Sequence, residues 1–365
     1  MRYKKYVTGL VFSVLCINLS IAQEFSDEFK EAIRQAQQAY QIPAIAVSLI
    51  TPDSIFSYVN GKSRWIKKDK IPQNAKFHLG SNSKAITSFI AMHLTEKGIL
   101  NWGTPFFKLF PELKAESKSE YLDITLGDLL SHNAQIRPYT TGLELSKFNT
   151  LKGSVSEKRY AFAKSVLTEK PIKKGTYSNA GYVLAALMLE KATGKTYREL
   201  VDQTMIDLDL DYFIGFPNKE NTTYPWGHWN QTGSLESLGP EHEYKLPDFM
   251  ASAGDISMNI KDYSSFIQLN LNGLLGVDNY VKAEDYNWLH FGQSPYAYGW
   301  GNVINNNEKM SYHDGSTGTF YCHTVVFPDK KIAAVIMINT ASNEAVKAIY
   351  EIQKQLTANP QKSKK

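Results

Sequence analysis

Cysteine is nearly absent from this 365-residue sequence, which contains only Cys16 and Cys322. Cys16 lies in an N-terminal segment that we expect to be removed, so the mature chain would keep one cysteine and form no internal disulfide. Cys322 stands in an alternating run of strand-forming residues, which favours a packed thiol over a nucleophile. A small domain held together by disulfides is therefore excluded.

Spacings typical of metal ligands are also missing. The eight histidines include no His-x-x-x-His pair and no His-Glu-x-x-His motif. Six of them are widely scattered: His78, His93, His132, His242, His290 and His323. A metal enzyme is thus a weak alternative, and we expect no metal ion and no other cofactor.

No excess of charge of one sign is present. The formal charge of +4 falls to +1 once Arg2, Lys4 and Lys5 leave with the N-terminal segment. A surface that binds nucleic acid needs a strong basic field, so nucleic acid is not expected as a partner. The lysines of residues 358–365 form a short basic tail, which we interpret as a solvated chain end.

No apolar run reaches the ~20 residues that a membrane-spanning helix requires. The N-terminus has a basic segment, Met1–Tyr6, and an apolar segment, Val7–Ile21, that ends in small residues. This pattern predicts a signal peptide over residues 1–22 and a secreted or periplasmic protein. A spanning helix is a weaker alternative because the apolar run is short. A lipoprotein modified on Cys16 is also weaker, because Leu15 replaces the small residue expected before a lipidated cysteine.

Apolar residues make up 43% of the sequence, enough for a large core, and no internal repeat is present. Strand-like runs lie near both ends, whereas helical periodicity dominates the middle. The runs are Ala44–Ile50, Ser54–Val59, Phe320–Phe327 and Ile332–Asn339. The pattern predicts an α/β (α+β) fold with one antiparallel sheet built from both termini. The first and last helices would flank this sheet, and a mostly helical lobe would be inserted in it.

We expect one domain over residues 23–357. Its sheet lobe would span about 23–80 and 295–357, and its helical lobe about 81–294. A cleft is expected where the lobes meet, because ligand sites favour such boundaries. Residues 211–249 are rich in Pro, Gly, Asn and aromatics, which predicts a long irregular segment.

Three predictions concern helix starts. Ser26 can cap a helix whose apolar face includes Phe29 and Ile33. Thr125 and Asp128 are expected to form a capping box. Residues Met258–Leu274 are expected to be helical.

Apolar residues recur at three- and four-residue intervals over Ala85–Gly98, which predicts a helix with one buried face. This helix begins directly after Ser81-x-x-Lys84. Residues three apart lie on one helix face, with Cβ atoms about 5–6 Å apart, so the hydroxyl of Ser81 and the amine of Lys84 should be neighbours. The positive end of the helix dipole would favour an oxyanion beside Ser81. The pair has the chemistry of a nucleophile and its activator, although a chain of this length contains Ser-x-x-Lys about once or twice by chance.

A phenol and an amide stand together in Tyr177-Ser178-Asn179, directly before a helix predicted over Ala180–Ala192. Side chains two positions apart on an extended turn point the same way, so Tyr177 and Asn179 would reach one cavity. The alternative is structural: Tyr177 packs in the core, and Asn179 caps the helix.

A third polar group, His313-Asp314-Gly315-Ser316, precedes the hairpin predicted for the last two strands. His313 can carry charge near neutral pH, and Gly315 would let another backbone approach closely. The alternative is a hairpin turn with a surface histidine.

In this order, the three polar groups resemble the signatures of the penicillin-recognising serine hydrolases. The matching motifs are Ser81-x-x-Lys84, Tyr177-x-Asn179 and His313-x-Gly315. The resemblance is to the branch of class C β-lactamases, D-alanyl-D-alanine carboxypeptidases and D-aminopeptidases, and it extends over roughly Pro43–Asn339. It implies a β-lactamase/transpeptidase-like fold.

The resemblance also implies roles. Ser81 would attack a carbonyl group and form an acyl-enzyme. Lys84 and Tyr177 would share the proton transfers, and either of them is open as the base.

On the substrate side, the resemblance implies that Asn179 holds the substrate amide. His313 would contribute a hydrogen bond or a positive charge toward the substrate. Gly315, which has no side chain, would let another backbone segment lie close at this point. The backbone N–H groups of Ser81 and Ser316 would form the oxyanion hole.

Two departures from the family pattern bear on the substrate. His313-Asp314-Gly315 replaces the Lys-Thr-Gly of many β-lactamases, as in the family's peptidases and esterases, which argues against fast antibiotic hydrolysis. The loop Ser131–Ile136 lacks the glycine usual there, so the rim of the cleft should differ. The aromatic segment Tyr224–Trp229 is a candidate pocket lining, with ordinary loop packing as the alternative.

We therefore expect an exported serine hydrolase that cleaves an amide or ester in a small molecule or short peptide. A D-amino-acid peptide or a small ester is favoured as substrate. A class C-like β-lactamase and a non-catalytic penicillin-binding or sensor protein are the alternatives. A Ser-His-Asp hydrolase is disfavoured because no Gly-x-Ser-x-Gly motif surrounds Ser81. The sequence leaves the oligomeric state open.

Overall fold

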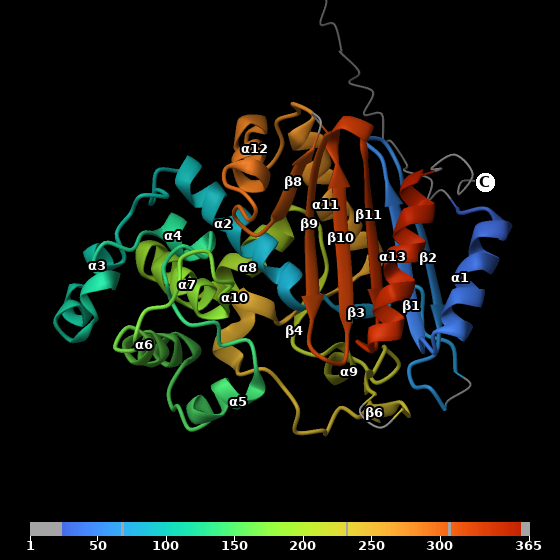
Figure 1. Cartoon of the computed structure of the whole chain (residues 1–365), viewed down its shortest axis with the longest axis horizontal. Helices are drawn as coiled ribbons and strands as arrows, with labels where there is room; N and C mark the ends of the chain where they lie inside the picture. The colour runs from blue at the N-terminus through green and yellow to red at the C-terminus, as the bar shows by residue number, and fades with distance from the viewer. Residues whose placement is uncertain (1–23, 67–68, 231–232, 306–307, 359–365) are drawn as a thin grey trace, which may run out of the picture.

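The computed structural model describes residues 24–66, 69–230, 233–305 and 308–358, so the predicted signal peptide and nearly all of the basic tail lie outside it. Six strands form one antiparallel sheet in the order β2-β1-β11-β10-β9-β8 (Figure 1). They are β1 Ala44–Ile50, β2 Ile55–Gly61, β8 Gly301–Asn305, β9 Glu308–Ser316, β10 Tyr321–Phe327 and β11 Ile332–Ile338. Strands from both ends of the chain thus share one sheet, as predicted.

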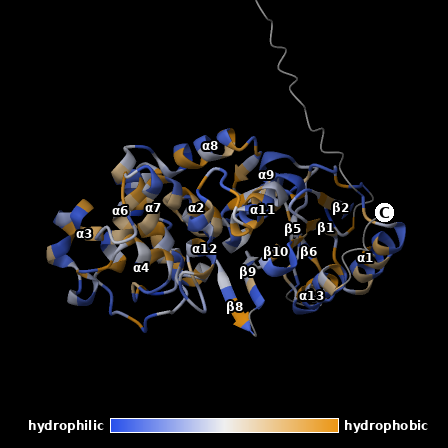
Figure 2. Ribbon diagram, turned by 90° about the horizontal axis from the view of Figure 1, so that it is seen from above, coloured by the Kyte–Doolittle hydropathy of each residue, from blue (hydrophilic) through white to orange (hydrophobic). Residues whose placement is uncertain are grey.

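The two central strands, β1 and β11, are buried at every residue. Seen from above, the sheet lies between α11 (Ile260–Leu274) on one side and α1 (Asp27–Ala39) with α13 (Asn343–Ala358) on the other (Figure 2). Because side chains alternate between the two faces, Ile45 packs with α1 and α13, whereas Ala46 belongs to the core on the α11 side. Burial on both faces explains why these strands read as continuous apolar runs.

Two helices that are buried on almost every side organise the helical lobe, α2 (Ser83–Glu96) and α7 (Asn179–Thr193). The sequence predicts a single buried face for the first of them, but α7, α8, α10 and α12 all pack against it. The remaining helices are α3 Phe106–Leu109, α4 Leu126–Leu130, α5 Gly142–Leu145, α6 Val155–Val166, α8 Tyr197–Asp207, α9 Pro217–Glu220, α10 Ala251–Gly254 and α12 Ala283–Phe291. None of the helices in the described part of the chain is long and apolar enough to cross a membrane.

Two assignments differ from the sequence prediction. The sequence predicts residues 260–274 in the helical lobe, but α11 packs against β1, β2 and β11 of the sheet. The predicted helix start at Met258 is also wrong, because Ile256–Asn259 form β7. This strand pairs between β3 (Lys76–His78) and β4 (Tyr212–Ile214) in a small second sheet. In the sequence, β3 of this second sheet comes shortly before the start of α2.

Predictions that depend on neighbouring residues alone are confirmed. Ser26 caps α1, since its hydroxyl accepts a hydrogen bond from the backbone N of Phe29. Thr125 and Asp128 form a capping box at α4. Cys322 is buried in β10, where burial raises the pKa of its thiol, so it is the packed thiol that the sequence predicts.

Candidate active site

Ser81 lies at the junction of the two lobes, in the 3-10 turn η1 (Gly80–Asn82) that joins β3 to α2. Strand β9 approaches this turn so closely that a Cβ on Gly315 would lie 1.9 Å from the carbonyl oxygen of Leu79 and 2.8 Å from the backbone N of Ser81. Gly80 makes the turn with a φ of +52°, which glycine adopts at little cost. Two glycines therefore bring the end of β9 against the start of the helix that follows Ser81.

Three oxygen atoms surround the Nζ atom of Lys84. It lies 2.5 Å from the carbonyl oxygen of Ala253, 2.7 Å from Oδ1 of Asn179 and 3.1 Å from Oγ of Ser81. The first two atoms can only accept, so they take up two N–H groups of the amine. In a neutral amine, the lone pair then faces the hydroxyl of Ser81.

Burial lowers the pKa of Lys84 well below its ordinary value of 10.5. The Nζ atom lies 4.7 Å from the ring centre of Tyr177 and 5.4 Å from that of Tyr182, and no carboxylate among the described residues shifts its titration. Lys84 therefore loses its proton at a lower pH than an exposed lysine does. This is the property that a general base requires.

Asn179 is the first residue of α7, but it does not cap the helix. Ser178 has that role, since its hydroxyl accepts a hydrogen bond of 3.2 Å from the backbone N of Gly181. The amide of Asn179 instead accepts from Lys84 and donates through Nδ2 to the carbonyl oxygen of Tyr139 at 3.0 Å. The capping alternative for Asn179 is therefore wrong, and its amide is held at the Ser-Lys pair.

The phenol of Tyr177 lies against Lys84 and beside Ser81. Burial raises the pKa of Tyr177, the hydroxyl of Ser81 offsets part of this rise, and the charge of Asp314 adds to it. Within the described residues, the buried hydroxyl oxygen has no hydrogen bond of good geometry. The raised pKa keeps the phenol of Tyr177 protonated. Because buried hydroxyls are normally hydrogen-bonded, the unused hydrogen bond of this one is available to a bound molecule.

His313 lies inside β9 and is buried, not in a turn ahead of a strand. Its Nδ1 donates to the carbonyl oxygen of Asp314 at 3.0 Å, and its Nε2 accepts from the hydroxyl of Tyr296 at 3.1 Å. Burial and the nearby Lys84 lower the pKa of His313 to about 3, so the imidazole is neutral at physiological pH. The expectations of a positive charge and of a surface histidine are both wrong.

Two rings that no sequence motif assigns to the site, those of His132 and Tyr296, pack against Tyr177. The ring of His132 lies 4.4 Å from that of Tyr177 and 4.4 Å from that of Tyr296. Its Nδ1 accepts a hydrogen bond of 3.2 Å from the backbone N of Ser178. His132 belongs to the loop Ser131–Ile136 and adopts a φ of +63° there, in a loop without the usual glycine. The missing glycine can be seen in the sequence, but the packing of the His132 ring against Tyr177 cannot.

Two backbone N–H groups converge near Ser81. At the end of the β9–β10 hairpin, the N of Thr317 donates to the carbonyl oxygen of Phe320 at 3.2 Å. Because bonded and non-bonded pairs alternate along an antiparallel ladder, the preceding pair, Ser316 with Tyr321, is non-bonded. The N–H of Ser316 thus points away from β10, toward the side of β9 on which the N of Ser81 lies.

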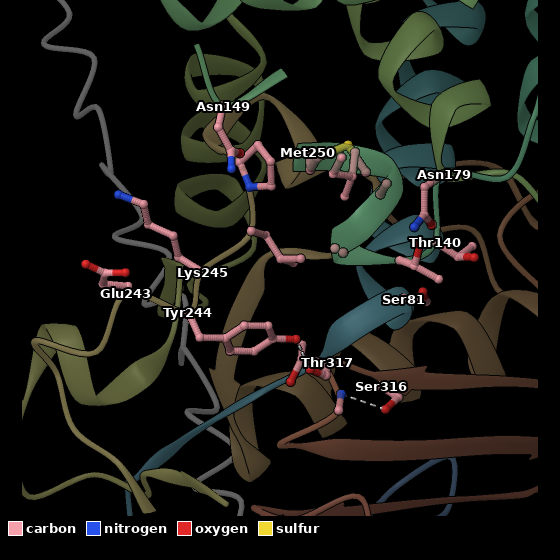
Figure 3. Close-up of a pocket in the computed structure, with 18 residues that line it drawn as sticks. Ser81, Thr140, Asn149, Asn179, Glu243, Tyr244, Lys245, Met250, Ser316 and Thr317 are labelled. Carbon is pink, nitrogen blue, oxygen red and sulfur yellow. Dashed lines mark hydrogen bonds between the residues drawn. The ribbon is translucent and has the colours of Figure 1, made fainter. Parts of the chain in front are cut away.

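A cleft of about 480 Å³ opens over Ser81 (Figure 3). Of the predicted residues, Ser81, Asn179 and Ser316 line it, whereas Lys84, Tyr177, His313 and Gly315 are not among its lining residues. Its apolar lining consists of Leu145, Tyr244, Leu246, Pro247, Met250 and Ala253. The hydroxyl of Tyr244 donates to the carbonyl oxygen of Thr317 at one end. No residue of Tyr224–Trp229 is among the described lining residues, so the structure does not support this aromatic segment as a pocket lining. Its second half is not a loop, because Gly227–Trp229 form strand β5, which pairs with β6 (Glu236–Leu238).

A serine and a lysine one helical turn apart, between an antiparallel sheet and a helical lobe, define proteins with the β-lactamase and penicillin-binding fold. The sequence pattern of the beta-lactamase family matches residues 29–357, and the chain belongs to this family. The resemblance and the fold predicted from the three motifs are therefore confirmed.

Two relatives are distant in sequence. The chain is 23% identical to Protein flp of Staphylococcus aureus (strain MW2) over 357 residues, which cover 92% of this chain and 67% of that protein. It is 23% identical to a beta-lactamase of Escherichia coli (strain K12) over 274 residues, which cover 74% of this chain and 68% of that protein.

Solved structures show the same fold. The octameric penicillin-binding protein homologue from Pyrococcus abyssi matches with a TM-score of 0.71 at 21% identity, over 92% of this chain and 78% of that one. A class C beta lactamase from Rhodobacter sphaeroides matches with a TM-score of 0.71 at 18% identity, over 91% and 99% of the two chains. At these identities the likeness establishes the fold and not the substrate.

Proposed function

We propose that this protein is a serine hydrolase that cleaves an amide or ester through an acyl-enzyme on Ser81. One observation carries the proposal: Nζ of Lys84 lies 3.1 Å from Oγ of Ser81, while its other two contacts are oxygens that can only accept. A neutral amine held in this way accepts the hydroxyl proton. Membership of a family whose proteins are generally serine hydrolases supports the same class of activity.

In the acylation step, the hydroxyl proton of Ser81 moves to Lys84 as Oγ bonds to the carbonyl carbon of the substrate. The carbonyl electron pair moves onto its oxygen, which the N–H groups of Ser81 and Ser316 stabilise; one lost donor of this kind costs about 3–4 kcal/mol. The bond to the leaving atom then breaks, and that atom takes a proton from Lys84 with the help of Tyr177. Water repeats the sequence to release the acid, while Asn179 holds the acyl group.

A fluorophosphonate probe read out by intact mass tests this proposal. The activated hydroxyl displaces fluoride, so labelling needs no turnover. We expect one adduct on the folded wild-type protein, mapped to the peptide that contains Ser81, and no adduct on Ser81→Ala. Labelling that persists in Ser81→Ala, or folded wild-type protein that resists the probe, would refute the assignment.

The same acylation step serves three narrower activities: cleavage of a D-amino-acid peptide, of a small ester, or of a β-lactam by a class C-like β-lactamase. A panel of these substrates, assayed with the labelled and unlabelled protein, separates them. A penicillin adduct that stays on Ser81 without release of product would instead identify a penicillin-binding or sensor protein.

We further propose export, with the signal peptide removed before Gln23 and a small molecule or short peptide as the only partner of the site. The support is the basic, apolar and small-residue pattern of residues 1–22. The intact mass of protein recovered from the periplasm or medium is expected to correspond to a chain that begins at Gln23. A chain that retains Met1 would contradict export by this route.

A further inference from the structure

The turn that carries Ser81 is tied to a buried histidine, His78, which the proposed chemistry does not use. His78 is the last residue of β3 and is inaccessible to solvent. Its Nδ1 accepts a hydrogen bond of 3.0 Å from the backbone N of Gly80. Its Nε2 lies 2.9 Å from Oδ1 of Asp255, which is buried directly before β7. The ring therefore joins the turn η1 to the chain segment that leads into β7.

These two contacts define where the ring carries its proton. A backbone N–H can only donate, so the bond from Gly80 requires a free lone pair on Nδ1 of His78. The ring proton is then on Nε2, where Asp255 accepts it. A proton on Nδ1 would meet the N–H of Gly80 and abolish that hydrogen bond. The carboxylate of Asp255 thus keeps His78 in the form that can hold Gly80.

Both peptide groups of Gly80 are held by hydrogen bonds, and one of these groups contains the N–H of Ser81. On the N-terminal side, His78 holds the N–H of Gly80. On the C-terminal side, the carbonyl oxygen of Gly80 accepts a hydrogen bond of 2.8 Å from the hydroxyl of Ser83. The C=O and N–H of a trans peptide point in opposite directions, so the N–H of Ser81 points away from Ser83. Gly80 has no side chain to restrict its rotation, so the direction of the Ser81 donor depends on these two hydrogen bonds.

The segment anchored by Asp255 also contacts the reacting groups. The carbonyl oxygen of Ala253, two residues before Asp255, accepts from Nζ of Lys84 at 2.5 Å. A Cβ on Gly254 would lie 3.7 Å from the backbone N of Ser81, so this segment packs directly against η1. Loss of the Asp255 anchor would therefore disturb both the oxyanion hole and the contacts of the amine.

From these contacts we infer that His78 and Asp255 are positioning residues for the acylation of Ser81. They orient the N–H group of Ser81 that stabilises the oxyanion, and neither of them is among the described residues that line the cleft. The inference rests on the proposed acyl-enzyme chemistry and adds two residues to it. A histidine with its carboxylate partner thus serves the serine through the backbone of the turn, and the proton of the Ser81 hydroxyl goes to Lys84.

Two variants of His78 test the inference, because each keeps one contact of the ring. Asn places its Oδ1 where Nδ1 lies and keeps the acceptor for Gly80, whereas Gln places its Nε2 where the ring Nε2 lies and keeps the donor to Asp255. The rate of fluorophosphonate labelling is measured per folded molecule, with the folded fraction taken from urea unfolding. We expect His78→Gln to be labelled about 100-fold more slowly than the wild type, and His78→Asn at least about tenfold faster than His78→Gln.

A merely structural role of the pair predicts the opposite order, because Gln keeps the buried carboxylate of Asp255 hydrogen-bonded and Asn does not. Equal rates for the two variants, or faster labelling of His78→Gln, would overturn the inference. His93→Gln is the control: Nδ1 of His93 lies 3.2 Å from the carbonyl oxygen of Tyr280, near the opposite end of α2. This variant should be labelled at the wild-type rate.

The tautomer of His78 is measured on the wild-type protein, so this part of the test does not depend on the folding of a variant. In NMR spectra of protein with ¹⁵N-labelled histidine rings, we expect a proton on Nε2 and none on Nδ1. A ring protonated on Nδ1 would overturn the inference. Wild-type protein that resists the fluorophosphonate probe refutes the proposed function itself, whereas labelled wild type with rapid labelling of His78→Gln refutes only the positioning role.

Asp255→Asn tests the partner of the ring. The carboxylate only accepts, whereas an amide also donates, so the variant no longer fixes the tautomer of His78. We expect labelling to slow by about tenfold and a population of rings protonated on Nδ1 to appear. An unchanged rate with an unchanged tautomer would overturn the assignment to Asp255.

Discussion

Replacement of Lys84 by Met is expected to lower the rate at which Ser81 is acylated by about 1,000-fold. The variant removes the amine that lies 3.1 Å from the hydroxyl of Ser81 and keeps an unbranched side chain of similar length in the fully buried site. The rate is measured as kcat/KM on a neutral ester and as the rate of fluorophosphonate labelling. Ser81→Ala removes the atom that is acylated and should not be labelled at all. In kcat/KM, adding Lys84→Met to Ser81→Ala should cause little further loss, because residues that act as a unit are not additive.

The protonation state of Lys84 predicts a second, independent difference between these proteins. Its pKa in the folded protein lies below 10.5, its value in the unfolded chain. Between the two values, the unfolded chain binds a proton that the folded protein does not bind, so the stability of the wild type rises with pH. The gain approaches about 1.4 kcal/mol per pH unit and ends near the unfolded value. Lys84→Met lacks this contribution.

Urea unfolding at several pH values from neutral to about 9.5 measures this difference. We expect the free energy of unfolding of the wild type to rise relative to that of Lys84→Met across this range. Lys97→Met is the matched control, because Lys97 is an exposed residue at the opposite end of α2. It should change neither the slope nor the labelling rate. Parallel slopes for wild type and Lys84→Met would mean that Lys84 stays protonated in the folded protein, and the role of base would then fail.

The parts of the structure that the sequence predicted are those fixed by residues close together in the chain. The spacing of Ser81 and Lys84 on one helical turn needs no tertiary information, and neither does the capping box at Thr125. The continuous apolar runs of β1 and β11 predicted central strands, because a strand that is buried on both faces needs apolar residues at consecutive positions.

The parts that the sequence did not predict depend on distant partners. His313 has the features of a surface histidine until β9 places it beneath Tyr296. His132 is one of several scattered histidines until the loop that carries it folds under Tyr177. Neither position carries a periodic signal, because each ring packs against rings more than fifteen positions away in the sequence. The positive charge expected at His313 is therefore wrong, although the structure brings the predicted residues together.

Gly315→Ala is expected to lower the acylation rate by about 100-fold and to destabilise the protein by about 1–3 kcal/mol. The added Cβ would lie 1.9 Å from the carbonyl oxygen of Leu79 and 2.8 Å from the backbone N of Ser81. Real contacts of this kind do not occur, so β9 and η1 must move apart. The N–H groups of Ser81 and Ser316 would then separate, although neither side chain of the Ser-Lys pair is altered.

Gly103→Ala is the control, since an added Cβ there would meet only a side-chain oxygen of Asn101 at 3.5 Å. Neither glycine has a positive φ, so the two substitutions differ in the space available and not in backbone strain. Activity is compared per folded molecule, with the folded fraction taken from urea unfolding. Gly103→Ala should retain the wild-type rate. If Gly315→Ala also retains it, the close approach of β9 does not align the two N–H groups, and the oxyanion would have to be stabilised by other donors of the cleft.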